Sequence, residues 1–226
     1  MLKLIAPVLL IALVAVSSEA ALIVRDPTPV EAADLLNEPL RAEARVGNSF
    51  GPSTPSDEKE ILISAFGGGS STADAVVLEA TAQAYSLATT ASGATTLTYA
   101  GVSSAPVQQT LSGNALKIEV FSAFDAIESA DLTFINGNGD SYPIGPLSAT
   151  GPNGRTIKII TGPDFDFTGS TLSGTITTTG AQASIFAIRG SDARVTVSLF
   201  TTVPVPEPAS IGLLALSFVI LGRRRR

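Results

Sequence analysis

The chain has 226 residues, of which 45% are hydrophobic and 15% charged, and its formal net charge is −6 at pH 7. It contains no cysteine and no histidine, which excludes disulfide frameworks, thiol nucleophiles, imidazole bases and histidine-ligated metals. The mean hydropathy of +0.36 is raised by two apolar ends. Between residues 21 and 205, nine lysines and arginines oppose eighteen aspartates and glutamates. A surface this acidic disfavours nucleic acid and anionic membranes as partners.

The N-terminal end has the three parts of a secretory signal peptide. Lys3 supplies the basic start, residues 4–16 form an apolar run, and small residues stand around Ser18 and Ala20. Signal peptidase is therefore expected to cut after Ala20, so that the exported chain begins at Ala21. The alternative is an N-terminal anchor that stays attached.

Residues 21–60 are predicted to form a region of short helices and linker. Thr28, Pro29 and Glu31 provide a cap, a proline at the first helical position and a capping-box glutamate. This helix is expected to run toward Asn37, before Pro39 stops it. A second short helix is predicted over residues 40–46, followed by a loop.

Residues 61–202 have the composition and alternation of short strands. The clearest strand covers residues 115–121, with three apolar residues on one face and Lys117 and Glu119 on the other. Further strands are predicted at residues 61–66, 95–99, 131–135, 155–161 and 170–178, and a hairpin at 183–188 and 194–201. Residues 75–87 fit a strand or a helix, and we favour the strand. About nine strands predict a mainly β fold, a β-sandwich resembling a jelly roll.

One turn has oxygen ligands at the spacing of a calcium loop. Asn136, Asn138 and Asp140 occupy alternate positions. Ser141 and Leu147 stand where an EF-hand loop needs its glycine and its bidentate glutamate. A calcium site and a plain glycine-assisted turn are therefore the two interpretations of this segment.

Two other groups of residues have a chemical and a structural interpretation. Asp164 and Asp166 would share one face of an extended segment, as an acid–base pair of a hydrolase or as a solvated edge whose phenylalanines turn inward. Tyr85, Tyr99 and Tyr142 could stack on sugar rings, but scattered tyrosines are more often part of a sheet. In both cases the structural interpretation is favoured.

The C-terminal end, residues 203–226, has three parts. A spacer with prolines at 204, 206 and 208 precedes an apolar run at residues 211–221 and a basic tip. The run is about 11 residues, shorter than the roughly 17–25 of a transmembrane helix. It is therefore expected to form a short hydrophobic helix that serves as a marginal anchor, with the basic tip held in the cytoplasm.

This order of parts resembles a PEP-CTERM sorting signal. The residues that carry the resemblance are Pro206, Glu207 and Pro208, with Arg223, Arg224, Arg225 and Arg226. The resemblance implies a substrate of exosortase, a membrane-embedded processing enzyme of Gram-negative bacteria that make exopolysaccharide. It also implies a cut near the Pro-Glu-Pro, after which the body is released or attached outside the cell. The alternative is an ordinary C-terminal membrane anchor.

Together these features predict an exported, non-catalytic protein of the cell surface or extracellular matrix. Its expected partners are signal peptidase, exosortase and extracellular polysaccharide, with transient insertion in the inner membrane, no nucleic acid, and no cofactor unless calcium binds. The first alternative is a glycan-binding module, with or without calcium. The second is a hydrolase that uses carboxylates.

Overall fold

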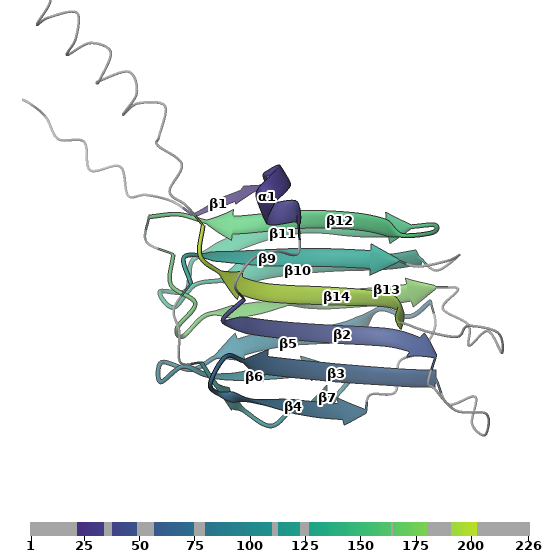
Figure 1. The fold of residues 1–226 in the computed structure, drawn as a ribbon, viewed down its shortest axis with the longest axis horizontal. Helices are drawn as coiled ribbons and strands as arrows, with labels where there is room; N and C mark the ends of the chain where they lie inside the picture. Colours follow the sequence, from purple (N-terminus) through teal and green to yellow (C-terminus); the bar gives the residue numbers. More distant parts are fainter. Residues whose placement is uncertain are drawn as a thin grey trace, which may run out of the picture.

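The chain folds into two antiparallel sheets that face each other. The structure is a computed structural model and describes residues 22–33, 38–48, 57–74, 80–109, 113–122, 127–163, 165–179 and 191–202. Figure 1 shows one sheet in front of the other, with α1 at one edge of the front sheet. The predicted mainly β sandwich is confirmed.

Each sheet has seven strands. The first sheet, in spatial order, contains β1 (Ile23–Arg25), β12 (Gly154–Thr161), β9 (Ala115–Ser122), β14 (Ser191–Phe200), β2 (Leu40–Asn48), β3 (Asp57–Ala65) and β4 (Gly69–Asp74). The second contains β11 (Ser141–Thr150), β10 (Ile127–Ile135), β13 (Thr171–Thr179), β5 (Gln83–Thr89), β6 (Ala94–Tyr99) and β7 (Val102–Ser103), with β8 (Val107–Gln108) also paired to β6.

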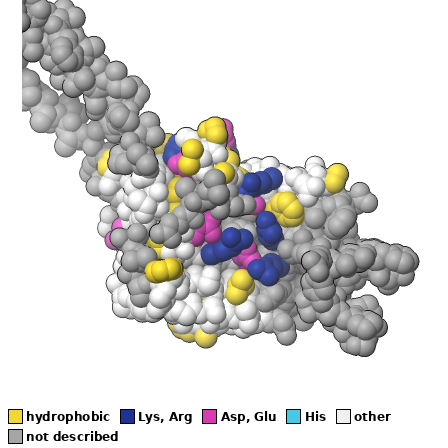
Figure 2. Space-filling model, in the orientation of Figure 1, with side chains coloured by type: hydrophobic (Ala, Val, Ile, Leu, Met, Phe, Trp, Pro, Cys, Tyr) yellow, Lys and Arg dark blue, Asp and Glu magenta, His cyan; other side chains and the backbone are white. Residues whose placement is uncertain are grey.

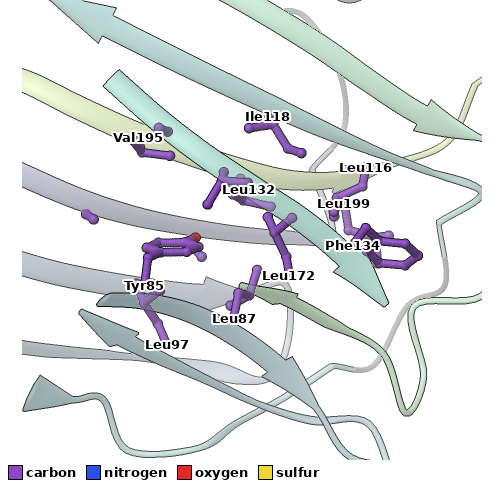
Figure 3. Close-up of a cluster of buried hydrophobic side chains, with 14 of the residues drawn as sticks. Tyr85, Leu87, Leu97, Leu116, Ile118, Leu132, Phe134, Leu172, Val195 and Leu199 are labelled. Carbon is purple, nitrogen blue, oxygen red and sulfur yellow. The ribbon is translucent and has the colours of Figure 1, made fainter. Parts of the chain in front are cut away.

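The core lies between the sheets and is made by every second residue of their strands. Figure 3 shows side chains of β9 and β14 meeting those of β5, β6, β10 and β13. The fully buried members include Leu116, Ile118, Leu132, Phe134 and Leu172. Phe165 and Phe167 stack on Phe134 at centroid distances of 6.0 and 6.3 Å, which confirms that these two phenylalanines turn inward. Burial of such side chains is the main stabilising contribution to the sandwich.

Strand β14 is the last strand in the described part of the chain and lies in the middle of the first sheet. It pairs with β9 on one side and with β2 on the other, so that Leu199 stands beside both Leu116 and Leu40. The strand predicted at residues 194–201 is present as β14. Its predicted pairing with residues 183–188 in a hairpin is wrong, because both edges of β14 are already paired. Residues 183–188 themselves lie outside the described part of the chain.

The segment predicted as a second helix, residues 40–46, is strand β2. Leu40, Ala42 and Ala44 face the core, while Arg41 and Glu43 project from the opposite face. Leucine, alanine, arginine and glutamate all have high helix propensity. Pairing with β14 and β3 overrides that propensity, as tertiary context commonly does. As a result, the sandwich includes strands from residue 23 onward.

Helix α1 (Pro29–Ala32) confirms the predicted capping box but is shorter than expected. Glu31 N–H donates to Thr28 Oγ1 at 3.4 Å, and Thr28 N–H donates to Glu31 Oε2 at 2.8 Å. The helix ends because Ala33 adopts extended backbone angles. Ala32 covers a small apolar cluster on the outer face of the first sheet, formed by Ala115, Ile157, Ile159 and Phe200.

The alternating segments gave correct strand predictions, and the segments without clear alternation did not. Strands β3, β6, β9, β10, β12, β13 and β14 lie where strands were expected, and β5 covers part of the ambiguous segment. Strands β1, β4, β7, β8 and β11 were not predicted. Strand β11 carries Pro143 and Pro146 and lies at a sheet edge, where a missing backbone N–H is tolerated.

The two ends of the described body lie in one row of the first sheet. Register pairing aligns Ile23, Thr161, Ala115 and Phe200 on four neighbouring strands. Asn114 fixes the exit of the chain, because Thr202 N–H donates to its Oδ1 at 2.6 Å and its Nδ2 donates to Thr202 O at 3.1 Å. The body therefore presents the same end to whatever precedes residue 22 and follows residue 202 (Figure 1).

Candidate functional site

The outer face of the first sheet carries an ordered grid of charged side chains. Because successive side chains of a strand point to opposite faces, the residues that alternate with the core positions project outward. Figure 2 shows basic side chains gathered over the middle of this sheet, with acidic side chains between them. Strands β2, β9, β12 and β14 supply them.

The grid has three rows that run across the strands. One row, which we call the arginine row, contains Arg155, Phe121, Arg194 and Arg45 on β12, β9, β14 and β2. The next contains Ile157, Glu119, Thr196 and Glu43 on the same four strands, and the third contains Ile159, Lys117, Ser198 and Arg41. A row of carboxylates thus separates two rows of cations.

Glu43 is the centre of one half of the grid. Its side chain is 1% exposed and accepts hydrogen bonds from two arginines. Arg41 donates to Oε1 from Nε at 2.8 Å and from Nη2 at 2.5 Å, and Arg45 Nε donates to Oε2 at 2.6 Å. Burial by itself would raise the pKa of Glu43, but the hydrogen bonds and charges of Arg41 and Arg45 outweigh it, and the pKa is lowered. Glu43 is therefore an ionised, buried carboxylate that holds two guanidinium groups in place.

Glu119 has the same function in the other half. Its side chain is 4% exposed and accepts a hydrogen bond from Arg155 Nη2 at 2.6 Å. Arg194 Nη2 lies 3.7 Å from the other carboxylate oxygen. The guanidinium carbon of Arg194 also lies 4.5 Å from the centre of the Phe121 ring, which gives a cation–π contact. Three contacts with residues of β9 thus determine where these two arginines lie.

Lys117 is the most buried cation of the grid. Its side chain is 1% exposed, and its Nζ lies 3.1 Å from Glu38 Oε1. Arg41 reaches the other oxygen of the same carboxylate at 3.4 Å. A buried ammonium group needs such a partner, since an unpaired one would cost several kcal/mol. Glu38 therefore connects the first half of β9 to the start of β2.

A second polar cluster lies inside the sandwich. Glu128 on β10 is 1% exposed, and Thr178 Oγ1 on β13 donates to its Oε2 at 2.5 Å. Burial raises the pKa of Glu128 to about 8, although the bond from Thr178 opposes this. The hydroxyls of Tyr85 and Tyr99 are buried nearby without a hydrogen bond of normal geometry, and burial raises the pKa of both.

The residues predicted for calcium form a closed turn. Asn136 Oδ1 accepts hydrogen bonds from the N–H groups of Asn138 and Asp140 at 3.0 and 2.8 Å. Asn136 Nδ2 donates to Asp140 Oδ2 at 3.0 Å. These bonds are those of a glycine-assisted turn between β10 and β11. Within the described residues, no three His, Cys, Asp or Glu side chains come close enough to hold a metal ion together. Calcium at this turn stays a prediction.

The remaining predicted site residues are two aspartates and three tyrosines, and they do not form one site. Asp166 Oδ1 accepts a hydrogen bond from Thr168 N–H at 2.8 Å, in a turn, while Asp164 lies outside the described residues. Tyr85 and Tyr99 are core residues in edge-to-face contact at 6.5 Å, and Tyr142 packs on Phe134. Tyr85 and Tyr99 are therefore buried away from any sugar ring, whereas Tyr142 is half-buried and its stacking on a sugar stays a prediction.

The grid was not among the sites predicted from the sequence. Its members lie as far apart in the chain as Glu43 and Thr196, whose hydroxyl donates to the carboxylate at 3.4 Å. The detectable signal was the alternation of Arg41, Glu43 and Arg45 with small or apolar residues, which repeats in Lys117 and Glu119. That alternation predicts a charged sheet face, but it does not predict which strands are neighbours.

Both predicted processing signals lie outside the described residues. They are the signal peptidase site at Ala20 and Ala21 and the tail with its Pro206-Glu207-Pro208 and arginine cluster. Within the described residues no helix combines the length and the apolar character needed to cross a membrane.

The comparisons with known proteins define the class of this chain. Its described part is a β-sandwich without a match among curated proteins. Residues 204–226 match the PEP-CTERM protein-sorting motif, which confirms the resemblance of the tail. The protein is therefore an exported protein with an exosortase-type sorting signal, and exosortase is the partner that this motif implies.

Proposed function

We propose that this protein is a non-catalytic component of the cell surface or extracellular matrix of a Gram-negative bacterium that makes exopolysaccharide. In this proposal signal peptidase removes residues 1–20, and the tail holds the chain transiently in the inner membrane until exosortase cuts it. The sorting motif at residues 204–226 is the observation that supports the proposal. A packed sandwich without disulfides is consistent with it, because its stability comes from its own core.

The matrix role predicts a change in the material around the cell. Deletion of the gene is expected to alter matrix composition or cell aggregation and to leave metabolic activities intact. Complementation with the full-length gene should restore the matrix. An unchanged matrix, measured by sugar content and by aggregation assays, counts against the proposal.

Processing depends on the Pro-Glu-Pro triplet. Replacement of Pro206, Glu207 and Pro208 by alanines is expected to leave the protein in the inner membrane with its arginine tail attached. The physical reason is that alanine removes the extended backbone that prolines impose and permits the apolar helix to continue through the spacer. Cell fractionation and intact-mass measurement check this result.

The matched control is Pro204→Ala, which changes a proline of the same spacer outside the triplet. It is expected to be processed like the wild type. A triple variant that reaches the medium at the wild-type mass would contradict the assignment of the triplet.

A second candidate function is a glycan-binding module, with or without calcium. The charged face of the first sheet favours it, because the arginines on this face are partly exposed. Retention of residues 21–205 on purified exopolysaccharide tests binding. Weaker retention with EDTA or with Asp140→Ala would indicate calcium, and no retention at any calcium concentration would reject this candidate.

A further inference from the structure

The cations of the body are concentrated on one face of one sheet. Of the nine lysines and arginines between residues 21 and 205, five belong to the grid: Arg41, Arg45, Lys117, Arg155 and Arg194. The same part of the chain has eighteen acidic residues. An acidic protein thus places most of its positive charge where strands β12, β9, β14 and β2 run side by side.

The arginine row holds three of the four partly exposed cations of the grid; the fourth, Arg41, is 39% exposed and lies in the third row. The side chains of Arg45, Arg155 and Arg194 are 34%, 31% and 28% exposed, whereas the carboxylates of Glu43 and Glu119 beneath them are 1% and 4% exposed. A ligand above the sheet therefore meets these guanidinium groups before it meets the carboxylates of Glu43 and Glu119. Adjacent strands are about 4.8 Å apart, so the four positions of the row span about 14 Å.

The arginines of this row are held in place before any ligand arrives. Glu119 fixes Arg155 and Arg194, Phe121 supports the Arg194 guanidinium, and Glu43 fixes Arg45. Binding then loses less side-chain entropy than it would with freely rotating arginines. Guanidinium groups also match carboxylate and sulfate geometry better than ammonium groups do.

The row lies far from the end of the body that leads to the sorting tail. Arg155 and Thr161 are six residues apart on β12, and Thr161 is in the row of Ile23 and Phe200. At about 3.4 Å per residue, this separates the arginine row from the exit of the chain by about 20 Å. A body held at its exit end therefore still exposes the row.

We infer that the arginine row binds an acidic polysaccharide, whose carboxylate or sulfate groups contact Arg45, Arg194 and Arg155 as the polymer lies across the strands. This inference deepens the glycan-binding candidate and rests on it, since it names the chemical class of the glycan. It is independent of calcium, because its binding groups are cations.

Charge density favours a polysaccharide over DNA. Duplex DNA carries one negative charge per about 1.7 Å of helix axis, and an extended contact would bring many phosphates close to an acidic body. The three arginines of the row lie on β12, β14 and β2, within four adjacent strands, so the cationic surface is narrow. A polymer with widely spaced anionic groups meets the arginines with less repulsion from the rest of the protein.

The test compares two variants with the same change in net charge. Glu119→Gln/Arg155→Gln/Arg194→Gln removes two cations of the row together with the buried carboxylate that they neutralise, so that no buried charge is left unpaired. Lys158→Gln removes one cation that lies outside the row and pairs with Asp26. Both changes lower the net charge by one. The probes are polygalacturonate, dextran sulfate, neutral dextran and duplex DNA, with the exported protein at low and physiological salt.

The wild type is expected to bind polygalacturonate, dextran sulfate or both, and not neutral dextran. The triple variant should bind at least about tenfold more weakly, which is the loss expected from a few charge-assisted hydrogen bonds, and Lys158→Gln should bind within about twofold of the wild type. If the triple variant does not fold, Arg45→Gln replaces it, because Arg41 still neutralises Glu43.

Three results would overturn the inference: equal binding by the wild type and the row variants, absence of binding to both acidic polymers, or tighter binding to DNA. Carboxylate-specific or sulfate-specific binding would identify the source of the anionic group. Failure here is distinguishable from failure of the matrix role, because a protein that binds no acidic polymer can still be sorted and change the matrix.

Discussion

The free energy of unfolding of the wild type is expected to fall between pH 5 and pH 8. Glu128→Gln is expected to remove a large part of this fall. The pKa of Glu128 is about 8 in the folded protein and 4.5 in its ordinary environment. Between these values the folded state holds a proton that the unfolded state releases. The contribution of Glu128 to the free energy of unfolding is therefore fully present below pH 4.5 and is lost as the pH rises to about 8. Between these values the free energy of unfolding falls by about 1.4 kcal/mol per pH unit.

The wild type should therefore lose about 4 kcal/mol between pH 5 and pH 8 through Glu128 alone, and the glutamine variant should not lose this amount. Tyr99 faces the same carboxylate, and its raised pKa reflects burial first and the charge of Glu128 second. Glutamine keeps the size and hydrogen-bonding capacity of the protonated acid. Urea denaturation at several pH values gives the two stability profiles.

Asp131→Asn is the matched control for this experiment. It changes an acidic residue to its amide on the same strand, at an exposed position. Because it leaves Glu128 unchanged, it should keep the loss of stability that Glu128 causes. If the Glu128→Gln and wild-type profiles are parallel from pH 5 to pH 8, Glu128 is not the group that titrates in the interior.

Gly174→Ala is expected to be among the most destabilising single substitutions in the sandwich. Gly174 lies in the middle of β13, with φ at 155°, between Leu132 on β10 and Tyr85 on β5. A Cβ atom there would lie 2.0 Å from the backbone oxygen of Asp131. Backbone on a paired strand cannot move aside alone, so the clash and the strained φ together should cost about 3 kcal/mol or more.

The control for this substitution is Gly151→Ala in the turn between β11 and β12. Gly151 also has a positive φ, 74°, but a Cβ atom there meets nothing within 4 Å. Its cost should be about 1 kcal/mol, from the backbone conformation alone. At about 2–4 °C per kcal/mol, thermal melting should separate the two variants by several degrees. Equal melting temperatures would show that β13 has more room than its geometry indicates.

The alternation of apolar and polar residues was enough to predict most of the fold. Residues 115–121 and 155–161 became β9 and β12, because alternation of this kind has one structural solution, a strand with one face in the core. Residues 40–46 alternate equally well, but their helix-forming residue types led to the wrong prediction. When the two signals conflict, the spacing of the charges is the better guide here.

The candidate site could not be predicted from the sequence in the same way. The order of strands in a sheet is decided by the packing of whole sheets. No local sequence pattern therefore predicts that Arg45, Arg194 and Arg155 lie in one row. The sequence also did not show that parts of the outer face are buried. Lys117 and Glu119 were correctly placed on the polar face, but both side chains are buried there. By contrast, the sorting tail was predictable because its signal is contiguous in the chain.

The central position of β14 has a consequence for when the protein can fold. Until residues 191–200 emerge, the first sheet consists of two half-sheets, β1–β12–β9 and β2–β3–β4, that no backbone hydrogen bond joins. Pairs such as Leu40 with Leu199 span most of the chain, and contacts of this range form slowly. The first sheet therefore cannot be complete before residues 191–200 have been synthesised. This delay leaves time for an unfolded chain to be threaded across a membrane before the sandwich closes.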